Sequence, residues 1–94
     1  MAAYQRLTAM DPMDAVRIAA EYLQKRIPLD VSSQDDHSVT LTGGDGTVTI
    51  SAHSHGMETS VTVSTDQLRT SRIDLESQNY LNQLPYQPED RQRR

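Results

Sequence analysis

The sequence predicts an α+β domain in which a helix, a three-stranded antiparallel meander and a second helix follow one another (αβββα), before a disordered tail. Two observations carry this prediction. Apolar residues recur at the helical spacing of about 3.6 up to residue 28, and they alternate with polar residues from residue 37 to residue 64. A length of 94 residues allows one domain. We therefore expect a flexible N-terminus at 1–10, one domain at 11–84 and a disordered polar tail at 85–94.

The first helix has a start and a stop in the sequence. Asp11 provides a side chain that can accept the free amides of the first turn, and Pro12 suits the first helical position. Pro28 ends the pattern. Between these residues one apolar stripe recurs at helical spacing, consisting of Val16, Ala19, Ala20, Leu23 and Ile27.

Three alternating segments, 38–42, 47–52 and 57–64, predict the strands of the meander. Glycine-containing turns at 43–46 and 55–56 separate them. If the first hairpin closes Thr42 against Thr47, Val39 lies opposite Ile50 on one apolar face. The register matters because a slip of one residue would move every side chain of a strand to the other face.

In the second hairpin we expect Ser54 to close against Met57, which places Ile50 opposite Val61 and Val48 opposite Val63. Both hairpins then share one apolar face, and this agreement favours the meander. The opposite face forms a flat array of methyls and hydroxyls that is either simply solvated or a docking surface. Its members are Thr40, Thr42, Thr47, Thr49, Ser51, Ser60 and Thr62.

After the strands, Thr65 or Asp66 can cap a helix that carries Leu68, and a second start signal follows at 71–74. We therefore expect a helix with a break near Thr70, whose apolar stripe ends before Pro85. The expected core consists of Val16, Ala19, Leu23, Ile27, Val39, Leu41, Val48, Ile50, Val61, Val63 and Leu68. Leu, Ile, Val and Phe together make up only 18 of the 94 residues, so the core of one chain is thin. We therefore predict a homodimer whose interface is formed by Ile73, Tyr80, Leu81 and Leu84.

Catalytic and metal-binding groups are sparse. His53 and His55 are spaced to lie on the same side of a strand, while His37 is expected on the apolar side, so two histidines without a third ligand predict no metal site. No nucleophile elbow or phosphate-binding glycine loop occurs in the sequence. We therefore expect that the chain is not an enzyme and that it binds no cofactor and no small-molecule substrate.

The distribution of charged residues is compatible with nucleic-acid binding. The net charge is -4, yet Arg91, Arg93 and Arg94 form a basic end, and Arg69 and Arg72 lie beside the second helix. These arginines are either phosphate contacts or a solubilising tail and solvated helix faces. The chain lacks Cys and any apolar run long enough to span a membrane, so we expect a cytoplasmic protein without disulfides or membrane association.

The stretch from Gly46 to Leu68 resembles the YbaB/EbfC family of small bacterial nucleoid-associated proteins. The resemblance rests on 46–50, on 61–63 and on Leu68, which would open the last helix. It implies a homodimer that binds double-stranded DNA with little sequence preference. The alternative is a protein–protein adaptor or structural component that binds its partner through an edge strand or through the Thr-rich face of the sheet.

Overall fold

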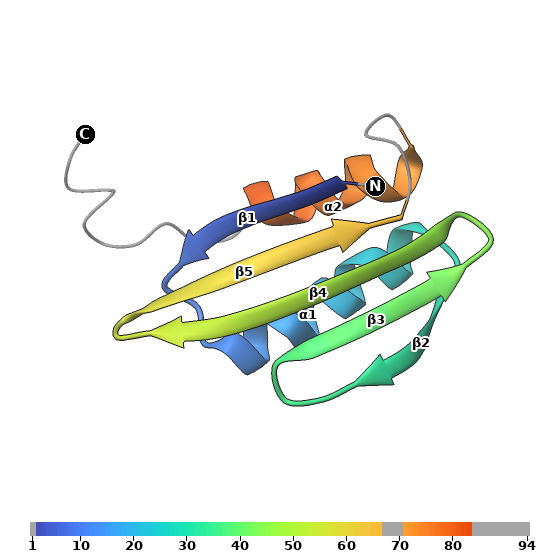
Figure 1. Cartoon of the computed structure of the whole chain (residues 1–94). Helices are drawn as coiled ribbons and strands as arrows, with labels where there is room; N and C mark the ends of the chain where they lie inside the picture. The colour runs from blue at the N-terminus through green and yellow to red at the C-terminus, as the bar shows by residue number, and fades with distance from the viewer. Residues whose placement is uncertain (1, 67–70, 84–94) are drawn as a thin grey trace.

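A computed structural model describes residues 2–66 and 71–83 and shows a five-stranded antiparallel sheet with two helices (Figure 1). The strand order across the sheet is β1-β5-β4-β3-β2. The elements are β1 (Ala2–Thr8), α1 (Pro12–Arg26), β2 (Leu29–Gln34), β3 (Ser38–Gly43), β4 (Gly46–His55), β5 (Glu58–Thr65) and α2 (Arg72–Asn82).

The predicted αβββα order is wrong, because the chain has the order β-α-β-β-β-β-α. Residues expected to be a flexible N-terminus form β1, and the segment after Pro28 forms β2. The two added strands are the edges of the sheet. Neither shows the alternation that identified the others: β1 turns Tyr4, Arg6 and Thr8 towards the helices, and β2 is exposed after its first residue.

Both helix starts are confirmed. Asp11 caps α1 by accepting a hydrogen bond from the amide of Met13 at 3.1 Å, with proline at the first helical position. Ser71 caps α2 in the same way by accepting from the amide of Asp74 at 3.3 Å. The expected break near Thr70 lies outside the described residues.

The first hairpin has the predicted register, with Thr42 opposite Thr47 and Val39 opposite Ile50. The register predicted for the second hairpin is wrong by two residues, because His55 pairs with Glu58 and Ile50 therefore lies opposite Val63. A shift of two residues keeps every side chain on the same face, so apolar alternation does not distinguish the two registers.

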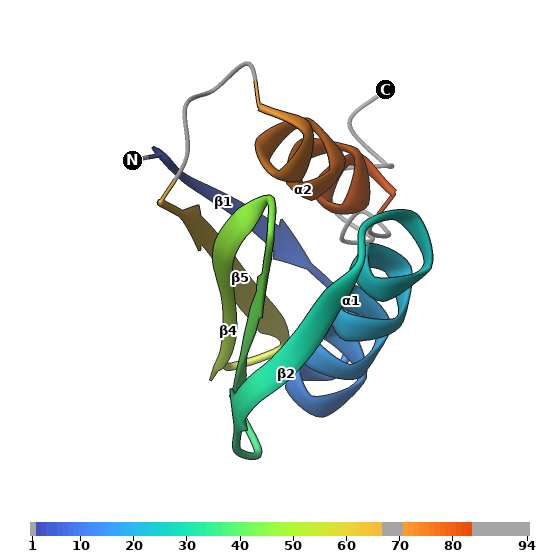
Figure 2. The same cartoon turned by 90° about the vertical axis from the view of Figure 1, so that its right-hand side faces the viewer.

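The core lies between one face of the sheet and the two helices (Figure 2). Every residue predicted for the core within the described ranges is buried, and Leu68 lies outside those ranges. α1 contacts β2, β3, β4 and β5, while α2 contacts β1, β4 and β5 and packs beside α1. Both helices thus cover the same face, and the described part of the chain leaves the other face of the sheet uncovered.

Candidate functional site

We define the open face as the outward side chains of the sheet on the side away from the helices, which faces the viewer in Figure 1. Strand pairing aligns these side chains in two central rows, one on either side of the middle of β4. The first row runs through Ala3, Ser64, Thr49 and Thr40, and the second through Gln5, Thr62, Ser51 and Ser38.

Hydroxyl and amide contacts across the strands hold several side chains of the open face in place. Thr40 and Thr49 bring their Oγ1 atoms to 3.2 Å, and Thr42 and Thr47 bring theirs to 3.3 Å. The side-chain amide of Gln5 donates to Ser60 Oγ at 2.5 Å. These cross-strand pairs restrict the side chains of the open face.

Charged groups occur at the ends of the open face and are missing from its two central rows. Asp66 closes one end, where its carboxylate accepts a hydrogen bond from the amide of Thr47 at 2.9 Å, and Glu58 lies at the other end. Arg6 is the single Lys or Arg in the five strands, and it lies on the helix side opposite Val61. The centre of the open face is therefore polar and uncharged.

His37 and His53 lie at one corner of this face. The rings of His37 and His53 stack with their centroids 6.3 Å apart, so the prediction that His37 faces the apolar side is wrong. The reason is a tight turn in which Asp35 accepts from the amides of His37 and Ser38, each at 2.8 Å. The hydrogen bonds that Asp35 accepts, first from the His37 amide and then from the Ser38 hydroxyl and amide, lower the pKa of its carboxyl.

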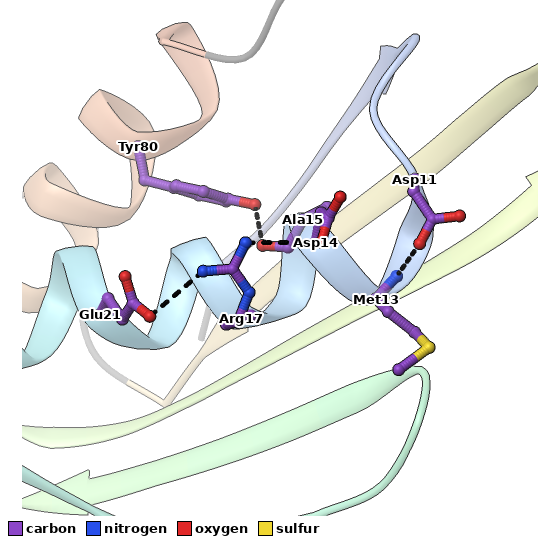
Figure 3. A network of polar contacts seen from close by, with 7 residues as sticks. All are labelled: Asp11, Met13, Asp14, Ala15, Arg17, Glu21 and Tyr80. Carbon is purple, nitrogen blue, oxygen red and sulfur yellow. Dashed lines mark hydrogen bonds and ion pairs between the residues drawn. The ribbon is translucent and has the colours of Figure 1, made fainter.

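No group of three metal-ligating side chains occurs within residues 2–66 and 71–83. A shallow hollow of about 460 Å³ lies between the start of α1 and the β2–β3 turn, lined by Met13, Asp14, Val16, Arg17, Gln34, Asp35 and Asp36. Arg17 spans this helix surface between Asp14 and Glu21, with both ion pairs at 3.4 Å (Figure 3). These exposed pairs contribute little to stability.

A buried polar network ties α2 to the β1 edge of the sheet. Asp74 is fully buried, and its carboxylate accepts from the Tyr4 hydroxyl at 2.5 Å, from the Gln78 amide at 3.0 Å and from the Thr65 hydroxyl at 3.3 Å. Tyr4 lies in β1, Gln78 in α2 and Thr65 in β5. The network fixes the position of α2 over the strands, because a buried carboxylate needs its hydrogen bonds.

The predicted interface residues Ile73, Tyr80 and Leu81 lie in the core of a single chain, with at most 5 % of their surface exposed. The five-stranded sheet is wide enough to cover α2, whereas the expected three strands were not. Leu84 lies outside the described residues, as do Arg69, Arg91, Arg93 and Arg94. Homodimerisation itself stays a prediction.

Arg72, expected as a phosphate or partner contact, joins the two helices. Its guanidinium donates to the main-chain carbonyl of Arg26. Arg26 in turn lies 3.7 Å above the ring of Tyr22 and pairs with Glu76 at 3.4 Å. Arg72 and Arg26 thus serve the contact between α1 and α2.

Tyr80 crosses this same contact and donates its hydroxyl to the carbonyl of Ala15 at 2.7 Å (Figure 3). Burial raises the pKa of Tyr80 above its ordinary value of about 10. Its contribution to stability is complete below the unfolded pKa and is lost as pH rises above that value. We expect Tyr80→Phe to cost about 1 kcal/mol at neutral pH and to flatten the alkaline loss of stability.

Urea unfolding at neutral pH and at about pH 11, above the unfolded tyrosine pKa, measures both effects. Tyr22→Phe is the control, because Tyr22 is only half-buried and its hydroxyl receives a hydrogen bond from Gln83 at the surface. An unchanged alkaline slope in Tyr80→Phe would show that another group is responsible.

Comparisons with known proteins found no matching family model, and no curated protein or solved structure with significant similarity. They add no support to the resemblance to the YbaB/EbfC family. Within the described residues, neither helix is long and apolar enough to cross a membrane.

Proposed function

We propose that this chain is a protein-binding module rather than an enzyme, and that it docks a protein partner on its open face. The observation that carries the proposal is the uncharged centre of this face in a chain of which 23 % is charged. Depletion of charge at the centre with charged residues at the rim is typical of protein interfaces. The distribution of charge on the open face thus supports the hypothesis of a protein–protein adaptor that binds through the Thr-rich face of the sheet.

The side chains of the open face also keep the entropic cost of docking low. Threonine and serine lose less conformational freedom on burial than lysine or glutamate, and cross-strand hydrogen bonds such as that between Thr40 and Thr49 already restrict them. Their hydroxyls can both donate and accept, so they can satisfy polar groups that a partner brings. A rigid sheet presents them without rearrangement.

DNA association has less support from the described residues. Phosphate binding requires basic side chains on one surface. The strands place none on the open face, while Arg17 and Arg26 pair with acidic residues and Arg72 donates to a carbonyl. Arg91, Arg93 and Arg94 of the tail lie outside the described residues. DNA binding by the tail is therefore tested by truncating the chain after Tyr86 and titrating both forms with DNA at two salt concentrations.

The proposal is tested by placing one charge at the centre of the open face. Ser51→Arg should weaken capture of a partner by about tenfold or more, because it buries an unpaired charge in the interface. Asn79→Arg adds the same charge on the exposed surface of α2 and should bind like the parent chain. Affinity capture from the extract of the source organism, quantified by mass spectrometry and followed by titration of the purified partner, measures both.

Circular dichroism and thermal unfolding would verify that both variants fold. The proposal fails if every protein bound by the parent chain is bound equally well by Ser51→Arg. It also fails if nuclease treatment removes the captured proteins, because nucleic acid would then be the ligand.

A further inference from the structure

The two edges of the sheet differ in how they are protected against pairing with another strand. β2 carries Asp30 and a register irregularity between Val31 and Ser33, where the Ser32 hydroxyl donates to the carbonyl of Thr40 at 3.2 Å. Charges and bulges are devices that keep an edge strand from pairing. β2 is therefore a protected edge.

β1 lacks the register irregularity of β2, and its one charged side chain lies on the helix side of the sheet. All seven of its residues pair with β5 in an unbroken register, and it contains no proline and a single charged residue, Arg6. The backbone groups on its outer side form a regular template for a further strand.

Leu7 flanks the β1 edge on one side of the sheet, and α2 flanks it on the other. Leu7, on the open face, is 44 % exposed, and Leu75 of α2 is 50 % exposed. Leu75 lies one helical turn before Gln78, which with Asn82 and Tyr4 lines a hollow of about 190 Å³ between α2 and β1. A strand that added to β1 would thus meet the exposed Leu7 on the open face and this hollow, whose lining is mostly polar, on the helix side.

We propose that β1 pairs with β1 of a second copy of this chain, antiparallel and centred on Gln5, to form one continuous ten-stranded sheet. This register is self-complementary. It places the small Ala3 opposite the large Leu7 of the second copy, and Tyr4 opposite Arg6 of the second copy. Gln5 lies opposite itself on the two-fold axis.

The neighbouring registers that keep both copies' helices on the same side are shifted by two residues, since a shift by one reverses the faces. Centring on Arg6 would place two guanidinium groups directly opposite each other, which destabilises a strand pair. Centring on Tyr4 would leave Leu7 and Thr8 outside the paired segments. The register centred on Gln5 alone pairs all of β1 without opposing like charges.

The inference does not depend on the proposed function, although the dimer would join two open faces into one surface. Because Gln5 is exposed, a charge at this position leaves the core of the monomer intact. Gln5→Lys and Gln5→Glu should each weaken the dimer by about tenfold or more, because like charges then face each other across the axis. An equimolar mixture of the two variants should dimerise again.

Sedimentation equilibrium over a concentration series measures the three dissociation constants, with thermal unfolding as the check on each fold. A dimer in the mixture, with both single variants predominantly monomeric, supports the proposal. The proposal is overturned if the parent chain is monomeric throughout the series, or if both variants dimerise like the parent. It is also overturned if the mixture stays monomeric.

Discussion

Replacing Asp74 by alanine is expected to lower the free energy of unfolding by roughly 3 kcal/mol. The carboxylate accepts hydrogen bonds from Tyr4, Thr65 and Gln78, and its removal leaves these donors without that acceptor in a largely dry site. An unsatisfied buried polar group costs about 1–3 kcal/mol, and water entry offsets part of the total. Urea denaturation of parent and variant gives the difference.

Asp14 offers a closely matched control. It occupies in α1 the same position that Asp74 occupies in α2, three residues after the capping residue, so both carboxylates interact similarly with the helix dipole. The Asp14 side chain is 55 % exposed, and its ion-pair partner among the described residues is Arg17. Asp14→Ala should therefore cost about 0.5 kcal/mol or less. Equal losses in the two variants would contradict the network and leave only a helix-end effect.

Gly43→Ala is expected to destabilise the chain by roughly 1–3 kcal/mol, the usual cost of overpacking. A Cβ at Gly43 would lie 2.3 Å from the carbonyl oxygen of Pro28 and 3.0 Å from the side chain of Leu29. The backbone contact cannot be relieved by rotating a side chain, so β2 would have to move away from β3. The effect is steric, because the described glycines with positive φ are Gly46 and Gly56.

Gly44→Ala, one residue along the same turn, is the matched control. A Cβ there has no heavy atom within 4 Å, so the substitution should change stability by no more than about 0.5 kcal/mol. Thermal or urea unfolding of the pair compares them directly. Similar stability for both variants would contradict the close approach of the α1–β2 connection to β3.

The sequence predicted the elements whose pattern is set by the core and missed those at the edges. Asp11 and Ser71 mark helix starts through local hydrogen bonds, and the β3–β4 register follows from facing apolar pairs such as Val39 and Ile50. The sequence did not predict β1, because Arg6 and Thr8 are polar although they face the covered side of the sheet. Apolar and polar residues therefore do not alternate along β1 in the way that predicts a half-buried strand.

The candidate site was predicted in part. The outward placement of the threonines of β3 and β4 follows from strand alternation, and the structure has it as expected. The sequence did not reveal that Gln5 and Ala3 extend this face, because β1 pairs with β5 across more than fifty residues of chain. The Asp74 network was missed for the same reason, since Tyr4 reaches it from β1 and only Gln78 is a near neighbour in sequence.

Site-specific photo-crosslinking in the cell tests directly whether the open face binds a protein. A photoreactive amino acid is placed at Thr49, in the middle of the open face, and in a separate chain at Glu21, on the exposed surface of α1. We expect one or a few discrete protein adducts from position 49 that are missing from position 21 and are lost when Ser51→Arg is added. The same adducts from both positions, or none from position 49 while position 21 yields them, would contradict the proposed function.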